Sequence, residues 1–176
     1  MILDSGERRT FDDGAVRDIV VGKGRCDLLP LDVISEFFTF WYKNYSSYIH
    51  SSDECHQAIV SDIVSNLYTF SADRKISHLY YILMCFIRYV YSDICTGILE
   101  VSKHYEEGCE KYGEHNWERG IPTHCFIDSS LRHLFKYFRG DDDESHDRAF
   151  VWNILGLIWT IFHKPEYDDF TQKVDI

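Results

Sequence analysis

A short acidic stretch, "EEGCE", places three glutamates within five residues: Glu106, Glu107 and Glu110. At about 100° per residue of an α-helix, their side chains fall at about 0°, 100° and 40° and share one quadrant of the helix surface. Like charges four residues apart destabilise an isolated helix by roughly 0.2–0.5 kcal/mol, and a bound cation would remove that cost. The stretch is therefore either a solvated helix face or one part of a metal site.

A second acidic pair, in "ESHD", could supply the other part of such a site. Glu144 and Asp147 are three residues apart, about 60° on a helix, and the apolar residues that follow predict that this helix enters the core. A carboxylate carried into a core needs a partner or a metal. Two helices that bring ExxE and ExxD together would form an all-oxygen site suited to Mg²⁺ or Mn²⁺. The alternative for "DDDESHD" is acidic capping of a helix N-terminus, without further function.

The same region also contains a histidine followed by an aspartate, His146-Asp147, which suggests a different class of enzyme. With His124, His133 and Asp168 it could form an HD-type metal phosphohydrolase. That hypothesis requires neighbouring side chains to point into one site, although neighbours on a helix diverge by about 100°. A third hypothesis is a non-catalytic nucleotide-sensing or interaction protein, in which the carboxylates are only a charged face.

The elements that must position these residues are predicted to be helices. Apolar residues recur at helical spacing, only 3 prolines interrupt the chain, and no clear alternating strand pattern occurs. A break is expected at Gly97, and stops are expected at Gly113, Gly140 and Pro165. The predicted class is all-α, with an irregular arm over 1–30 and helices over about 31–48, 52–70, 73–96, 98–112, 123–139 and 141–163.

Composition limits the possible partners and the location. A chain of 176 residues can bury the core of a single domain, and its net charge of −11 opposes binding to duplex nucleic acid. The apolar run from Leu79 to Ile87 is too short to span a membrane. The six cysteines form no CxxC pair and no signal-peptide pattern precedes them, so a cytoplasmic location is expected.

Several blocks of the sequence resemble known enzymes. "EEGCE" followed by "ESHD" resembles the EExxE and ExxD signature of MazG-like all-α nucleoside triphosphate pyrophosphohydrolases, although the gap between the motifs is longer than usual. "GKGRCDLLPLDV", "EKYGEHNWERGIP", "LRHLFKYFRGDDD" and "HDRAFVWNILGLIWT" resemble the phage-associated, MazZ-like dATP/dGTP diphosphohydrolases. The resemblance covers residues 1–31 and about 98–160, which leaves 34–95 as a helical insertion and 98–163 as the catalytic helices of a single domain, 1–176.

The resemblance implies a function. A MazG-like helical bundle would hydrolyse dGTP, with dATP as a second candidate substrate, to the monophosphate and pyrophosphate in the cytoplasm of a phage-infected cell. Two or three Mg²⁺ or Mn²⁺ ions and a homodimer or homotetramer are expected. The residues carried over as direct metal ligands are Glu107, Glu110, Glu144 and Asp147. Glu106 would either bind a further ion or hold the attacking water.

Substrate contacts are expected from basic, amide and aromatic side chains. The candidates for phosphate binding are Lys23, Arg25 and Lys111. Asn116 and Trp117 lie in a loop, where an amide can bind a purine edge and an indole can stack on it, or the indole can plug the core beneath the loop. Asn153 within the apolar helix needs a buried partner, either the ligand or the backbone. Tyr112 is expected in the core.

Overall fold

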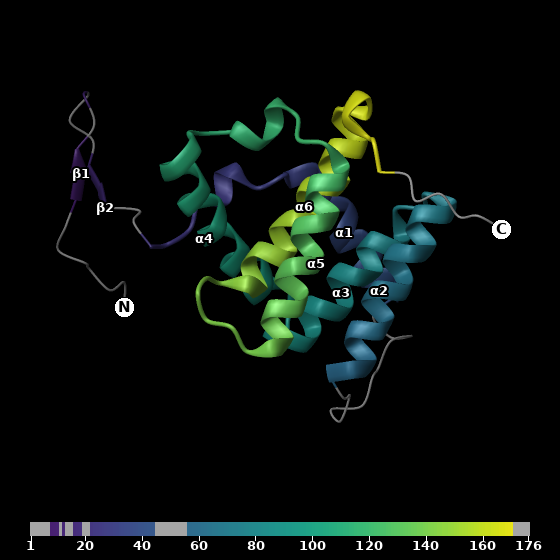
Figure 1. Ribbon diagram of the computed structural model, residues 1–176. Coiled ribbons are helices and arrows are strands. Elements are labelled where there is room, and N and C mark those ends of the chain that lie inside the picture. The colour runs from purple at the N-terminus through teal and green to yellow at the C-terminus, as the bar shows by residue number, and fades with distance from the viewer. Residues whose placement is uncertain (1–7, 11, 13–15, 19–21, 45–55, 171–176) are drawn as a thin grey trace.

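The computed structural model describes residues 8–10, 12, 16–18, 22–44 and 56–170, and the structural statements below concern these residues. Six α-helices form its body, which confirms the all-α class (Figure 1). The elements are β1 (Arg8–Thr10), β2 (Val16–Asp18), η1 (Cys26–Leu28), α1 (Leu31–Asn44), α2 (His56–Asp73), α3 (Ser77–Tyr91), α4 (Ile94–Tyr112), η3 (Asn116–Arg119), α5 (Thr123–Arg139), α6 (His146–His163) and η4 (Pro165–Tyr167). The expected end of the first helix at 48 and start of the second at 52 lie outside the described residues.

Helix α6 lies at the centre of the fold, as its sequence predicts. It contacts α1, α3, α4 and α5, and Figure 1 shows α5 and α6 running side by side. A helix with neighbours on most sides must be apolar on most sides, and 11 of its residues are buried. Gly156 allows α5 to approach closely, because a Cβ atom there would lie 2.5 Å from the ring of Phe126.

Glycine ends two of the helices that carry candidate residues. Gly113 follows α4 with φ 86° and Gly140 follows α5 with φ 87°, and both amides donate to carbonyls of the last helical turn. Glycine adopts this left-handed region without the penalty that a Cβ atom brings. The predicted stops at both positions are confirmed, and α6 ends at His163 ahead of Pro165 as expected.

Two predicted helix boundaries are wrong. The break between α3 and α4 lies at Ser92, with φ 67°, rather than at Gly97. Asp93 caps the new helix by accepting from the amide of Thr96 at 2.9 Å, a local signal stronger than one helical glycine. Helix α6 begins at His146, so Glu144 lies in the preceding loop and not on the helix.

Two apolar residues of α4 are exposed, and for one of them, Tyr112, the sequence predicts a position in the core. The core side of α4 carries Val101 and Tyr105, whereas Leu99, two residues before Val101, points about 200° away and is 55% exposed. Tyr112 is 59% exposed at the last position of α4.

A two-stranded antiparallel sheet and a short 3₁₀ turn precede the helices. β1 pairs with β2 in the register Arg8 to Asp18, an element that the sequence analysis does not predict. Farther along, the amide of Arg25 donates to the carbonyl of Ser102 at 2.9 Å and ties this segment to α4. Among the described helices none is by itself long and apolar enough to cross a membrane; α3 and α4 pass that test only as a pair bent by 95°.

Candidate functional site

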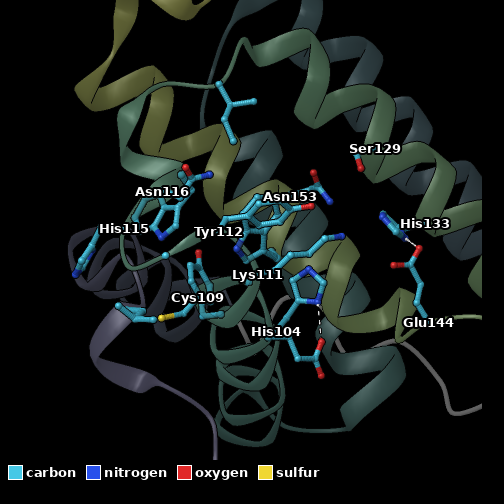
Figure 2. A pocket seen from close by; sticks show the side chains of 18 residues that line it. His104, Cys109, Lys111, Tyr112, His115, Asn116, Ser129, His133, Glu144 and Asn153 are labelled. Atoms are coloured by element: carbon cyan, nitrogen blue, oxygen red, sulfur yellow. Dashed lines mark ion pairs between the residues drawn. The ribbon is translucent and has the colours of Figure 1, made fainter.

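A cavity of about 490 Å³ lies between α4, η3, α5 and α6 (Figure 2). Its volume suits a small-molecule ligand of nucleotide size. Six of the eleven residues predicted from the sequence line it: Glu107, Lys111, Asn116, Trp117, Glu144 and Asn153. Because these residues come from four separate segments, the fold itself assembles the site.

The two glutamates in the cavity come from the two acidic motifs. Glu107 is carried by α4, and its carboxylate oxygens lie 3.6 Å from Nδ1 of His104 and 3.6 Å from Nη1 of Arg148. Glu144 comes from the loop before α6, and its Oε1 lies 3.4 Å from Nδ1 of His133. Both side chains are about half exposed, at 59% and 48%, so both can reach a ligand in the cavity.

The other three carboxylates do not line the cavity. Glu106 is buried, and its two oxygens accept from the amides of Gly22 at 2.9 Å and Gly24 at 2.7 Å. Asp147 accepts from the hydroxyl of Tyr91 at 2.7 Å, on the side of α6 that faces the end of α3. Glu110 is exposed on α4. The structure thus brings one carboxylate from each motif together and gives Glu106 and Asp147 protein partners.

Of the three basic residues predicted to bind phosphate, one lines the cavity and two do not. Lys111 lines the cavity, with Nζ 5.0 Å from the ring centroid of Tyr112. The guanidinium of Arg25 is bound by Asp27 at 2.7 Å and Glu114 at 2.8 Å, beside the end of α4. Lys23 is exposed in the loop whose flanking glycine amides bind α4, and it does not line the cavity.

Three buried polar atoms in the cavity wall have no hydrogen-bond partner among the described residues. They are Nδ1 of His104, the hydroxyl of Tyr105 and Nε1 of Trp117, and only two other buried side-chain atoms in the described part share this state. A buried polar atom without a partner costs about 1–3 kcal/mol, so such atoms are expected where a polar ligand binds. Neither His104 nor Tyr105 can be identified as a site residue from the sequence, because nothing local distinguishes them from core residues.

The ring of Trp117 is buried rather than presented to a ligand. It packs edgewise against Tyr105, with centroids 5.7 Å apart, and against Trp159 at 4.9 Å. The hydrophobic plug considered from the sequence therefore describes the ring. Trp117 still lines the cavity, and its indole N–H has no partner among the described residues. Asn153 is 4% exposed and its amide donates to the carbonyl of Ala149 at 2.7 Å, so the backbone is one of its partners.

Burial keeps two of these groups uncharged. Desolvation, and secondarily the nearby His133, lowers the pKa of His104 to about 4, so the imidazole is neutral at pH 7. Burial likewise raises the pKa of the Tyr105 hydroxyl, which stays protonated. The cavity wall therefore presents a neutral imidazole and a phenol beside two carboxylates.

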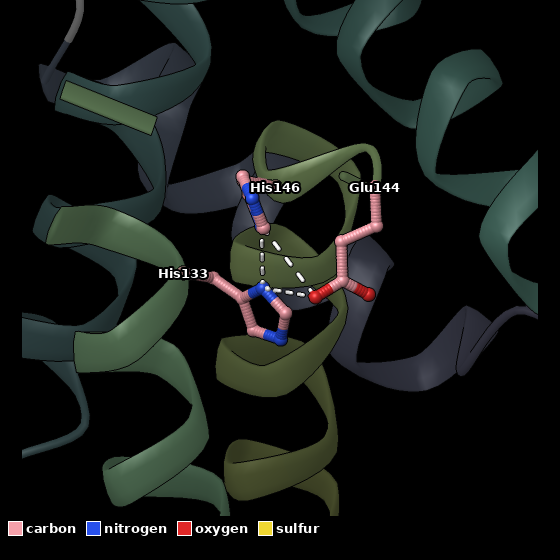
Figure 3. Close-up of side chains that lie close together, drawn as sticks. All are labelled: His133, Glu144 and His146. Atoms are coloured by element: carbon pink, nitrogen blue, oxygen red, sulfur yellow. Dashed lines mark hydrogen bonds and ion pairs between the residues drawn. The ribbon is translucent and has the colours of Figure 1, made fainter. Parts of the chain in front are cut away.

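Two histidines and a glutamate form a group that could hold a metal ion at one end of the cavity (Figure 3). Nδ1 of His133 on α5 lies 3.0 Å from Nδ1 of His146 at the start of α6. Oε1 of Glu144 lies 3.4 Å from the first and 3.6 Å from the second. The two histidines are 13 residues apart in the sequence, a spacing that does not by itself predict a metal site. Only the packing of α5 against α6 brings them together.

The HD-type set is not gathered around one point. His146 points toward His133, whereas the neighbouring carboxylate of Asp147 binds the hydroxyl of Tyr91. His124 and Asp168 lie in another network at the start of α5. The divergence expected for neighbours on a helix accounts for this separation.

Comparison with protein families supports the resemblance to dATP/dGTP diphosphohydrolases. Residues 88–170 match the model of the family described as dATP/dGTP diphosphohydrolase, N-terminal. This segment runs from the end of α3 to just beyond η4 and contains every residue that lines the cavity except Leu28. The block expected in residues 1–31 falls outside the match. No curated protein and no solved structure matches the chain.

Proposed function

We propose that this chain is a metal-dependent pyrophosphohydrolase of purine deoxynucleoside triphosphates. The family match supports hydrolysis of dATP or dGTP, and it coincides with the segment that forms the cavity. The observation that carries the proposal is that Glu107 and Glu144, from two distant motifs, line one cavity. Tyr105 and Trp117 also line it, and each has a buried polar atom with no partner in the described part of the chain. We also propose the MazG-like grouping on the basis of these two acidic motifs.

The donor chemistry of the cavity fits a divalent cation. Carboxylate oxygens are preferred by Mg²⁺ and Mn²⁺, and Glu107 on α4 and Glu144 in the loop before α6 supply them. Glu110 and Asp147 stay predicted ligands, although a contribution from Asp147 would require it to release the Tyr91 hydroxyl. When bound, such ions would neutralise the triphosphate and polarise the attacking water.

The side chains of the cavity have distinct roles in the proposed reaction. Lys111 contacts the phosphates, and water attacks the α-phosphorus as the bond to the bridging oxygen of the β-phosphate breaks and pyrophosphate leaves. The proton of the water passes to Glu107 or to the neutral imidazole of His104, which lie 3.6 Å apart. Glu106, whose oxygens hold the amides of Gly22 and Gly24, is better suited to positioning the preceding segment than to holding water.

We expect hydrogen bonds, more than stacking on the ring of Trp117, to recognise the purine base. The indole N–H and the Tyr105 hydroxyl are donors, and purines present acceptors on their edges. Asn116, which lines the cavity, offers both a donor and an acceptor. The exposed ring of Tyr112 at the rim is the better candidate for stacking on the base.

A panel of deoxynucleoside and ribonucleoside triphosphates, incubated with the protein and Mg²⁺ or Mn²⁺, tests the proposal. Phosphorus NMR should show pyrophosphate and dGMP or dAMP. Glu107→Gln and Glu144→Gln should each lower kcat by about 10²-fold or more, whereas Asp128→Asn, exposed on α5 outside the cavity, should not. Nucleotide binding without pyrophosphate release would instead support the non-catalytic alternative, and full activity in both glutamine variants would refute our assignment.

We further propose that the protein assembles as a homodimer or homotetramer, as the resemblance implies. Sedimentation velocity at micromolar concentration measures this directly. A single species with the mass of one chain would contradict it.

A further inference from the structure

Two buried histidines face each other beside the loop that precedes α6 (Figure 3). His133 is 8% exposed and His146 is 2% exposed. Their Nδ1 atoms lie 3.0 Å apart, and Oε1 of Glu144 lies 3.4 Å and 3.6 Å from them. We propose that His133, His146 and Glu144 bind a first-row transition-metal cation through two nitrogens and one oxygen.

The distances among the three atoms fit one shared cation. Nitrogen ligands lie about 2.0–2.1 Å from such a metal, so two ligands are about 3.0 Å apart at a right angle and about 3.4 Å apart in a tetrahedron. The three observed separations lie in or just above this range. Since α5 and α6 each fix one histidine, little rearrangement is needed for the atoms to converge on an ion.

The hydrogen bonding of His146 directs its free electron pair toward the same point. Its Nε2 lies 2.8 Å from a carboxylate oxygen of Asp143, which also binds Nζ of Lys136 at 2.6 Å. A carboxylate held by a lysine accepts the Nε2–H, so Nδ1 faces His133 as the acceptor nitrogen. Histidines that bind metals usually have such a carboxylate on the other ring nitrogen.

The ligand set also indicates which cations the group would prefer. Imidazole nitrogens favour Co²⁺, Ni²⁺ or Zn²⁺ over Mg²⁺, which prefers oxygen. His133 and Glu144 both line the cavity, so the cation would be open to a ligand on that side. A role for this ion in catalysis rests on the proposed function, whereas its binding does not.

A simple hydrogen bond between the histidines is the competing explanation. If Nδ1 of His133 carries a proton, it can donate to Nδ1 of His146 without any metal. The two explanations differ in whether the protein binds Co²⁺ or Zn²⁺ at this group in the absence of nucleotide. Direct metal titration therefore separates them.

Co²⁺ titration of the EDTA-treated, dialysed protein tests the proposal through its visible absorption bands, with calorimetry for Zn²⁺. We expect one Co²⁺ per chain at this group. His133→Gln combined with His146→Gln should weaken binding at least 100-fold. Asp143→Asn, a change at an exposed side chain that should leave the fold intact, should weaken it about 10–100-fold.

Two control variants locate the ion. Asp142→Asn, exposed in the same loop, and Asp128→Asn, exposed on α5 outside the cavity, should retain Co²⁺ affinity within about twofold of the unmodified protein. Absence of stoichiometric Co²⁺ binding, or its persistence in the double histidine variant with an unchanged circular dichroism spectrum, would overturn the proposal. Since the measurement needs no nucleotide, Co²⁺ binding without pyrophosphate release would refute only the proposed function.

Discussion

At the scale of single residues, the hydroxyl of Tyr105 separates a ligand-binding role from a structural one. It is buried at 3% exposure and has no partner among the described residues. Tyr105→Phe removes an unpaired polar atom and should leave the melting temperature unchanged or raise it. If the hydroxyl binds the base, KM for the purine substrate should rise about tenfold, corresponding to about 1.4 kcal/mol.

Tyr80 provides the matched control for this prediction. Its hydroxyl is also buried without a partner in the described part of the chain, but it does not line the cavity. Tyr80→Phe should therefore leave KM unchanged and affect the melting temperature in the same direction. Equal KM values for the two variants and the unmodified enzyme would show that the Tyr105 hydroxyl does not contact the substrate.

His104 should make the folded protein less stable as the pH falls into the mildly acidic range. Burial, and then the charge of His133, lowers its pKa from about 6.5 to about 4 in the folded chain. Between these values the unfolded chain binds a proton that the folded chain does not, so the free energy of unfolding falls as pH decreases from 6.5 to 4. The loss should be on the order of 3 kcal/mol.

Urea unfolding in EDTA at several pH values measures this effect. The pKa of His133 is also lowered by burial and adds a decrease of the same sign, so the comparison must be between proteins. His104→Gln should show a clearly smaller decrease than the unmodified chain. Parallel curves for the two would show that His104 does not contribute.

At the scale of secondary-structure elements, two helical glycines should respond to alanine with opposite signs. A Cβ atom at Gly156 would lie 2.5 Å from the ring of buried Phe126, between α6 and α5, whereas nothing lies within 4 Å of one at Gly108 in α4. Gly156→Ala should lower the free energy of unfolding by about 1–3 kcal/mol. Gly108→Ala should raise it by about 0.5–1 kcal/mol. If the urea midpoints of both variants shift in the same direction from that of the unmodified protein, this account of the packing of α5 on α6 is wrong.

Helix α4 holds the segment before η1 through Glu106. Glu106→Gln replaces one carboxylate oxygen by an amide nitrogen that cannot accept from Gly22 or Gly24, and should cost about 1–3 kcal/mol. Hydrogen exchange of these two amides should accelerate. Glu110→Gln, exposed on the same helix, should change stability by less than about 0.5 kcal/mol. Unchanged hydrogen exchange at the Gly22 and Gly24 amides in the Glu106→Gln variant would show that Glu106 does not hold this segment.

The elements were predictable where local chemistry decides them. Helical periodicity and the glycines at 113 and 140 identify α4 and α5, because these signals act within one turn of the chain. The break at Ser92 was missed, since it depends on the Asp93 cap and on α4 turning sharply away from α3. The start of α6 was placed too early because acidic residues suit both a loop and a first helical turn.

At the scale of the whole molecule, the site was predictable only in part. The sequence identifies Glu107 and Glu144 as partners, and the cavity does bring them together. Helix geometry alone cannot say that Glu106 turns toward a glycine loop or Asp147 toward Tyr91, because both depend on which neighbour packs on each face. The pairing of His133 with His146 likewise follows from the antiparallel packing of α5 and α6.

A ligand in this cavity should stabilise the entire fold, because its walls come from α4, η3, α5 and α6 and exist only in the folded chain. A non-hydrolysable α,β-methylene analogue of dGTP with Mg²⁺, at one hundred times its Kd, should add about 2.7 kcal/mol. For a chain of this size, that would raise the melting temperature by roughly 5–10 °C. The matching dCTP analogue at the same concentration should produce a smaller shift, and Tyr105→Phe should reduce the shift with the purine. Equal shifts for both analogues would show that the cavity does not read the base, and no shift with either would place nucleotide binding elsewhere.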